Sequence, residues 1–441
     1  MKNFTLAHCI VEHRQINWFI PYADNPHIHS AKQKEMFQAA VFRSRHINPL
    51  LAKPDGTLIA GQLRLDAARE MGLEELPVII LSHLSEADVL ALRIADNAIA
   101  KNADWSIELL AKNFELIAAL DVTIEPIELG FETAEYDQIR LGSVPPPSVD
   151  PVPVPDETAP TVSRVGDVIQ VGCHTIVCGD SRDPEVYKLA LGDRVAKAVI
   201  SDQPWNLTAK FIGGKGKKKF DNFAMAAGEM STQEFEAFTE QVLTCQAQFC
   251  APGALVAQFI DWRSVDIMVR VGRKTVGPLI NICVWVKQSG RFGSPWRSRH
   301  ELVCIFRRDG AESQDNVRLG RYGRTRTNIW EYDAPAIFGS QRDKLQIHPT
   351  AKNEAMIADF IRDCTDRGDL VLDAFLGSGT SALAAHQTGR VGVGVEIEPA
   401  YVDLAVQRLA DATGEVPRLV DGTSFADLRA QRLGEEVQHG I

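Results

Sequence analysis

Short apolar runs alternate with amphipathic runs of helical length through the C-terminal part of the chain, and this pattern constrains the fold most. It predicts strands over residues 174–178, 196–200, 369–373 and 391–395, and helices over 184–191, 381–388 and a run that starts at Pro399. Strands joined by helical crossovers pair in parallel, with helices on both faces of the sheet. The pattern therefore predicts an α/β, Rossmann-like fold that binds ligands at the carboxyl ends of its strands.

A proline-rich segment precedes this region. Prolines recur through residues 143–161, and proline is excluded from the interior of helices and of central strands. We therefore expect a stiff, extended linker there. It would separate an N-terminal domain over residues 1–142 from a C-terminal domain over 162–441.

The N-terminal region is predicted to be a small α+β domain with a helical extension. Helices are expected over residues 32–43, 62–71, 85–100 and 107–120, and a buried strand over 76–81. Asp55-Gly56 is typical of a tight hairpin turn, and Gly72 of a left-handed helix cap.

Length and composition narrow the class of protein. At 441 residues the chain is too long for one core, and it contains no run of 18 or more apolar residues that would predict a membrane span. Charged residues follow soon after the first methionine, which argues against a secretory signal. The eight cysteines are scattered, so we expect free thiols in a reducing cytoplasm, with a zinc site as the weaker interpretation and no metal in the active site.

The charge is unevenly distributed. The chain carries a formal net charge of −11, but residues 206–330 hold 19 Lys/Arg against 11 Asp/Glu, a local net charge of +8. A polyanion should therefore meet this middle segment rather than the rest of the protein.

A glycine loop follows the predicted strand over residues 369–373. Gly377 and Gly379 lie between that strand and the next helix, where missing side chains let a ligand approach the backbone. Glu396 closes the following strand, a position suited to ribose hydroxyls. The spacing is also compatible with a dinucleotide site, or with a tight strand–helix turn that binds nothing.

The run Asp202-Gln203-Pro204-Trp205 follows the strand over residues 196–200. A carboxylate and a backbone carbonyl can accept both hydrogens of an exocyclic amino group, while an aromatic ring stacks on the base. Alone, the run is equally typical of a surface turn.

Together these motifs resemble the β-class DNA amino-methyltransferases, in which a D-P-P-Y catalytic motif precedes an F-x-G-x-G cofactor motif. Further matching runs are 166–172, 178–181, 285–287, 299–301, 348–352 and 394–396 with Tyr401. The resemblance covers nearly all of residues 162–409. It implies a circularly permuted methyltransferase sheet, S-adenosylmethionine as cofactor, and methylation of an amino group in double-stranded DNA after the base has left the stack.

The resemblance also implies roles for individual residues. Asp180 would lie near the cofactor adenine and Glu396 at its ribose. The methionine portion would be surrounded by Asp373, Phe375, Gly377, Gly379 and Thr380. Catalysis would fall to Asp202, Gln203, Pro204 and Trp205.

Two positions depart from the family's catalytic motif. Gln203 stands where the family has proline, and Trp205 where it has tyrosine. The leading Asp202 favours adenine N6 as the target, with cytosine N4 as the alternative. The departures also leave open a DNA-binding regulator whose methyltransferase half turns over weakly.

Two basic runs are the expected DNA contacts. The first holds Lys215, Lys217, Lys218 and Lys219, and the second holds Arg321 and Arg324 with Arg318 and Arg326. Lysine and arginine side chains of this kind contact phosphates and position a duplex.

The N-terminal region resembles the ParB/sulfiredoxin-like domain. The resemblance depends on Asn48-Pro49, on the run 61–64 with Ala67-Ala68, on 76–78 and on 91–97. Gly61 and Arg64 at a helix start could hold a phosphate, but Leu63 replaces the family's second arginine. Domains of this family are often labelled ParB-like nucleases, but the sequence shows no cluster of carboxylates that would bind a metal for nuclease chemistry. We therefore expect a module that docks on DNA or forms a homodimer, with nuclease activity as the alternative.

Overall fold

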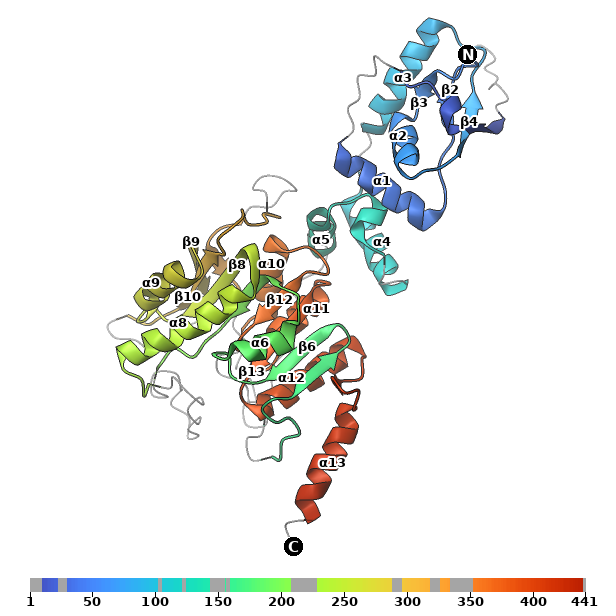
Figure 1. Cartoon of the computed structure of the whole chain (residues 1–441). Helices are drawn as coiled ribbons and strands as arrows, with labels where there is room; N and C mark the ends of the chain where they lie inside the picture. The colour runs from blue at the N-terminus through green and yellow to red at the C-terminus, as the bar shows by residue number, and fades with distance from the viewer. Residues whose placement is uncertain are drawn as a thin grey trace. The chain divides into compact units, whose positions relative to one another are not determined.

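The structure is a computed structural model that describes residues 10–22, 30–101, 105–120, 124–142, 155, 159–207, 228–287, 296–317, 326–333 and 352–438. The chain divides into two compact units, Met1–Pro145 (unit 1) and Pro146–Ile441 (unit 2). Figure 1 shows unit 1 in blue to teal and unit 2 in green to red. The predicted proline linker lies mostly outside the described residues.

Unit 1 contains a four-stranded sheet in the order β1-β4-β2-β3. Its strands are β1 (Val11–Gln15), β2 (Leu50–Ala52), β3 (Leu58–Ala60) and β4 (Glu75–Ile80). Its helices are η1 (Ile16–Trp18), α1 (Ala31–Ser44), α2 (Gln62–Glu70), α3 (Glu86–Lys101), α4 (Ile107–Leu120), η2 (Pro126–Leu129) and α5 (Thr133–Gly142). The expected turn between β2 and β3 is present, with Gly56 at φ +89°. Leu50 of β2, Leu76 of β4 and Leu65 of α2 are fully buried in the core of this unit.

Unit 2 is built on a ten-stranded sheet in the order β11-β9-β10-β8-β7-β12-β13-β6-β5-β14 among the described residues. The strands are β5 (Val168–Val171), β6 (His174–Cys178), β7 (Ala196–Ser201), β8 (Cys250–Ile260), β9 (Leu279–Val286), β10 (His300–Arg307), β11 (Ile329–Glu331), β12 (Leu370–Asp373), β13 (Val391–Glu396) and β14 (Arg418–Leu419). Strands β6, β13, β12, β7 and β8 are parallel neighbours, and β10 runs antiparallel to both β8 and β9.

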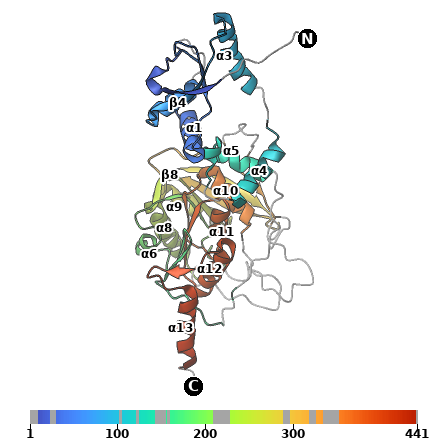
Figure 2. The ribbon, with the colours of Figure 1, turned by 90° about the vertical axis from the view of Figure 1, so that its right-hand side faces the viewer.

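Helices cover both faces of this sheet (Figure 2). They are α6 (Pro184–Leu191), α8 (Thr232–Gln248), α9 (Val265–Thr275), α10 (Glu354–Cys364), α11 (Thr380–Gln387) and α12 (Pro399–Thr413). The last helix, α13 (Phe425–Gln438), contributes Phe425 and Leu428 to the core and then extends beyond the sheet (Figure 1). Leu370 and Leu372 of β12 pack with α6, α8 and α9, whereas Val371 packs with α10 and α11. This alternation is the expected result of a strand buried on both faces.

The predicted circularly permuted, Rossmann-like sheet is confirmed. The chain enters the sheet through β5 and β6, and the central strand β12, which leads into the glycine loop, comes late in the sequence. The predicted helices and strands agree with the structure to within one or two residues at each end. None of the helices in the described residues is long and apolar enough to cross a membrane.

The middle segment contributes much of the sheet. Its described parts form α8, β8, α9, β9 and β10. Residues 228–287 hold five Lys/Arg against six Asp/Glu, and residues 296–317 hold four against four. The positive excess of residues 206–330 therefore falls almost wholly on residues outside the described part of the chain.

Candidate active site

Four carboxylates follow four neighbouring parallel strands of unit 2. In the order of the sheet they are Asp180 after β6, Glu396 at the end of β13, Asp373 at the end of β12 and Asp202 after β7. The carboxyl ends of parallel strands meet at one edge of a sheet, which is where open α/β sheets bind ligands. Every one of these residues was singled out in the sequence, and the topology brings all four to the same edge.

The glycine loop between β12 and α11 has two left-handed residues. Gly377 has φ +52° and Gly379 has φ +87°, values that residues with a side chain rarely adopt. A Cβ on Gly379 would lie 3.0 Å from the Cβ of Ala405, whereas a Cβ on Gly377 would meet no atom within 4 Å. Gly379 therefore allows close packing on α12, and the backbone at Gly377 lies against open space.

Glu396 connects β13 to the glycine loop. Its Oε2 accepts a hydrogen bond from the Gly377 N–H at 2.8 Å, and its Oε1 accepts one from the Glu398 N–H at 2.9 Å. Burial raises the pKa of Glu396 to about 7, although these amide bonds oppose the shift. The neighbouring Asp373 adds to the increase because like charges disfavour ionisation.

Asp373 is buried at the end of β12. Its Oδ1 accepts from the Phe375 N–H at 3.0 Å, and its Oδ2 accepts from the Ser381 hydroxyl at 2.6 Å. Burial raises the pKa of Asp373 to about 6, against the effect of these bonds. The edge therefore combines carboxylates that are costly to ionise without a cationic ligand.

Asp180 is held by a neighbouring arginine. Both of its oxygens accept from the Arg182 guanidinium, at 2.6 to 3.1 Å. Burial raises the pKa of Asp180, but the bonds from Arg182 outweigh it and the net shift is downward. The guanidinium lies 6.0 Å from the centre of the Phe238 ring, and Phe238 lies 6.3 Å from the ring of Phe375. Asp180 and Phe375 are thus joined through a small aromatic cluster.

The run Asp202–Trp205, predicted to be catalytic and called the catalytic run below, contains three polar atoms that are buried and have no hydrogen-bond partner among the described residues. They are Asp202 Oδ1, Gln203 Oε1 and Trp205 Nε1. Buried polar groups are nearly always paired, so these three atoms are available to a further hydrogen-bond partner. The other oxygen of Asp202, Oδ2, lies 2.6 Å from the Nζ of Lys352.

Gln203 replaces a proline without leaving the run loose. Its Nε2 donates to the Thr239 hydroxyl of α8 at 3.0 Å, so the side chain fastens the run to that helix. Asn206, at φ +55°, then accepts from the backbone N–H groups of Gly228 and Met230 and donates to the Met230 carbonyl at 2.7 Å. Both anchors restrict the backbone where the proline is missing.

Comparison with known proteins decides the class. Residues 196–407 match the N6/N4 family model described as DNA methylase. The chain carries a DNA methylase domain. The predicted resemblance to the DNA amino-methyltransferases is therefore confirmed, and the matched residues include the catalytic run, the glycine loop and Glu396.

Individual relatives match over shorter or more distant alignments. The type II methyltransferase M.ScaI of Streptomyces caespitosus is 37% identical over 95 residues, which are 21% of this chain and 31% of that protein. M.HpaI of Haemophilus parainfluenzae is 23% identical over 228 residues, 48% of this chain and 67% of that protein. The chain thus spans about a third of the first relative and about two thirds of the second.

Two solved structures match the chain at low sequence identity. The cytosine-N4-specific PvuII DNA methyltransferase matches with 17% identity and a TM-score of 0.42, covering 56% of this chain and 95% of that one. A truncated ParB from Caulobacter crescentus matches with 18% identity and a TM-score of 0.27, covering 31% of this chain and 79% of that one.

Several residues of the methylase site carry no role in the sequence-based prediction. Ser201 accepts from the Ala374 N–H at 2.9 Å and so ties β7 to the glycine loop, and Arg182 and Ser381 bind two of the carboxylates. Lys287, Glu301 and Lys352 lie in the matching runs, but their pairing is not visible in the sequence. For Glu301 a signal was available in the sequence: it is an ionisable residue directly before the apolar run Leu-Val-Cys-Ile-Phe. Such residues are seldom fully buried unless they are paired.

The predicted phosphate contacts remain predictions. Lys215, Lys217, Lys218, Lys219, Arg321 and Arg324 all lie outside the described residues. Arg326 is described, and it pairs with Asp359 at 2.8 Å and Asp363 at 3.1 Å instead of standing exposed.

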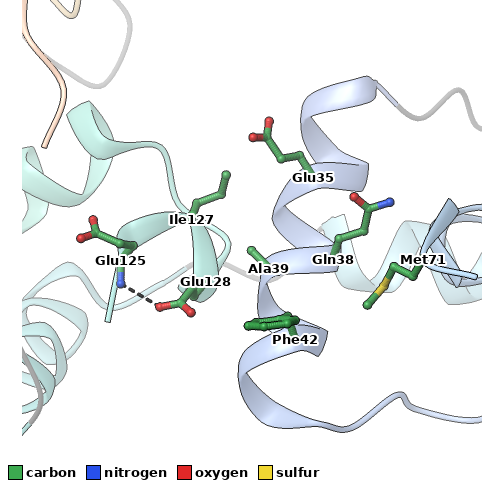
Figure 3. A pocket seen from close by; sticks show the side chains of 8 residues that line it. All are labelled: Glu35, Gln38, Ala39, Phe42, Met71, Glu125, Ile127 and Glu128. Atoms are coloured by element: carbon green, nitrogen blue, oxygen red, sulfur yellow. Dashed lines mark hydrogen bonds between the residues drawn. The ribbon is translucent and has the colours of Figure 1, made fainter. Parts of the chain in front are cut away.

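Described residues of unit 1 also line a cavity. A cavity of about 550 Å³ lies in unit 1, where α1 faces η2 (Figure 3). It is lined by Glu35, Gln38, Ala39, Phe42, Met71, Glu125, Ile127 and Glu128. Its three glutamates disfavour a nucleic-acid ligand. In the described part of the chain no cluster of His, Cys, Asp and Glu could hold a metal, and the described cysteines are free thiols.

Proposed function

We propose that the protein transfers a methyl group from S-adenosylmethionine to an exocyclic amino group in double-stranded DNA, with adenine N6 as the target. The observation that carries the proposal is the single sheet edge where the glycine loop, Glu396 and Asp202 meet. The DNA methylase model over residues 196–407 supports the reaction class. Asp202 at the head of the catalytic run favours adenine, and cytosine N4 is the alternative within the same family.

The residues present fit the cofactor. When bound, S-adenosylmethionine supplies an electrophilic methyl group on a sulfonium sulfur. The Glu396 oxygens each have a further lone pair beyond their amide bonds, which suits ribose hydroxyls. The backbone at Gly377 is open to a ligand, and Asp373 places negative charge next to it. Thr380 and Phe375 complete the proposed methionine pocket, and Asp180 stands on the adenine side.

Asp202 acts on the base. An exocyclic amino nitrogen is a poor nucleophile because its lone pair is delocalised into the ring. When Asp202 Oδ1 and a backbone carbonyl of the run accept its two hydrogens, the nitrogen moves toward tetrahedral geometry and its lone pair is freed. Trp205 would stack on the base and hold it outside the duplex, which costs about a few kcal/mol of lost stacking and pairing. Positioning and electrostatics are then sufficient, without a covalent intermediate.

The direct test is methyl transfer by the purified protein. We expect labelled methyl from S-adenosylmethionine to enter mixed-sequence duplex DNA, and nucleoside analysis to show N6-methyladenine. N4-methylcytosine would contradict the choice of base and leave the reaction class standing. Measurable cofactor binding without any methyl transfer would contradict the proposal that the protein is an enzyme and would favour a DNA-binding regulator. That alternative is suggested by Gln203 and Trp205, which depart from the family's catalytic motif.

Cofactor binding should strengthen as the pH rises. Burial raises the pKa of Asp373 to about 6 and of Glu396 to about 7, both above the ordinary values near 4, so a cation binds best once both have lost their protons. The same carboxylates lower the stability of the cofactor-free protein as the pH rises from about 4 to about 7, since the folded state then holds more protons than the unfolded one. We expect at least about tenfold tighter binding at pH 8 than at pH 5.5 by calorimetry. Equal affinity at both values would contradict a role for these two groups.

A further inference from the structure

A buried row of alternating charges lies beneath the catalytic run. Lys287 directly follows β9, Glu301 lies in β10, Lys352 precedes α10 and Asp202 follows β7. Lys352 Nζ lies 2.6 Å from Asp202 Oδ2 and 3.0 Å from Glu301 Oε2, and Glu301 Oε1 accepts a hydrogen bond from Lys287. Two cations and two carboxylates thus alternate along the row, and their charges balance.

The row is withdrawn from solvent. The side chains of Lys352 and Glu301 are 7% and 8% exposed, and that of Asp202 is 25% exposed. Lys352 Nζ also lies 4.8 Å from the centre of the Phe259 ring and 5.1 Å from that of Trp205. Charges in such surroundings persist only when they are paired, and ring faces add attraction for the ammonium group.

Lys352 stabilises the ionised form of Asp202. Burial raises the pKa of Asp202 and the net shift is upward, but the ammonium group of Lys352 opposes it more strongly than any other group. Burial lowers the pKa of Lys352, but the attraction of Asp202 and Glu301 outweighs it, and the net shift is upward. The ammonium group occupies only Oδ2, and Oδ1 remains buried without a partner in the described residues.

We propose that Lys352 is a positioning residue that keeps Asp202 as a carboxylate and leaves Oδ1 as the acceptor for the target amino group. Glu301 and Lys287 hold Lys352 in place from the other side. The inference rests on the proposed function, because it assigns Oδ1 to the base. Without Lys352 the carboxyl group would take up a proton and present a donor where an acceptor is needed.

The activity test compares Lys352→Met with the wild type across pH. We expect the maximal transfer rate to fall by roughly 10²-fold, and the acid limb of the rate profile to move up by at least about one pH unit, with unchanged KM for the cofactor. Lys274→Met, which removes an exposed lysine of α9, is the matched control and should change neither quantity. A Lys352→Met protein with the rate and pH profile of the wild type would contradict the positioning role.

Chemical rescue separates charge from packing. Lys352→Ala leaves a space lined by Trp205 and Phe259 that propylammonium can enter, and 1-propanol has the same size without the charge. We expect propylammonium to restore transfer at least about tenfold while 1-propanol does not, because only a cation can hold Asp202 ionised. Equal rescue by both compounds would show that Lys352 only fills space.

A stability cycle tests the pair without any turnover. Lys352→Met should lower Tm by roughly 5–15 °C, since it strands two buried carboxylates, and adding Asp202→Asn should recover part of that loss. Additive effects of the two substitutions would mean that Lys352 does not support Asp202. A wild-type protein without transfer activity would instead contradict the proposed function. The Tm values of the variants would then still show whether Lys352 and Asp202 interact.

Discussion

Replacing Asp202 with asparagine is expected to lower the methyl-transfer rate by roughly 10³-fold while leaving cofactor affinity within about threefold of the wild type. The substitution keeps the size of the side chain but puts an amide in place of the carboxylate whose Oδ1 is buried and unpaired. An amide can place its NH2 group toward the base, where it would repel the amino hydrogens, and its oxygen is a weaker acceptor than a carboxylate. Asp202 follows β7, one strand away from β12 and its glycine loop, so the cofactor pocket should survive.

The measurement is single-turnover transfer to duplex DNA, with calorimetry for the cofactor. Asp261→Asn is the matched control, because Asp261 follows the neighbouring strand β8 and pairs with Arg263 at 2.8 Å rather than with the catalytic run. Its transfer rate should stay within about threefold of the wild type, since a partly exposed ion pair contributes little. Comparable losses in both variants would show that the edge tolerates no change of charge and that Asp202 has no special role.

The sequence was sufficient for the acidic edge because the relevant information is local. Each of Asp180, Asp202, Asp373 and Glu396 follows an apolar run of strand length, and alternation with helices makes those strands parallel. Parallel strands necessarily bring their carboxyl ends together. The conformation of the glycine loop was equally predictable, because two glycines between a strand and a helix indicate left-handed backbone.

The row of buried charges was not predictable in the same way. Lys352 pairs with Glu301, 51 positions away, and with Asp202, 150 positions away, and only the folded sheet brings these residues together. Most lysines in folded proteins are exposed, so the sequence predicts an exposed Lys352. Only the structure shows that it is buried between two carboxylates. The partner of Gln203 on α8 is hidden for the same reason, since the hydrogen bond to Thr239 spans 36 positions.

The net charge of residues 206–330 did not show which parts of this segment belong to the sheet. Its net positive charge predicted a DNA-contacting region, and that expectation still stands for the lysine and arginine runs outside the described residues. The described helices and strands between those runs instead build one flank of the sheet, and β9 and β10 supply Lys287 and Glu301 to the catalytic side. A charge count averages over buried and exposed residues, so it could not separate the framework of the sheet from the runs that are predicted to contact DNA.

Replacing Glu396 with alanine is expected to weaken S-adenosylmethionine binding by about 10²-fold. The carboxylate has one role in the structure and a second in the proposed function. It holds the glycine loop to the end of β13 through the Gly377 N–H at 2.8 Å, and it presents lone pairs at the position expected for the ribose hydroxyls. Hydrogen bonds to a charged group contribute about 1.5–3 kcal/mol each, so the loss of the ribose contacts and of loop order should exceed one factor of ten.

Glu398→Ala is the control for this substitution. Glu398 lies two residues further along the chain and is exposed, and its backbone N–H rather than its side chain bonds to Glu396. Its cofactor affinity should remain within about twofold of the wild type, because exposed carboxylates contribute little to a site they do not touch. The Glu396→Ala protein should also lose much of the pH dependence of binding between pH 5.5 and 8, because the group whose pKa burial raises to about 7 is gone. If its affinity matched the wild type at pH 8, the ribose assignment would be wrong, and the cofactor would have to be held by Asp180 and the glycine loop without the end of β13.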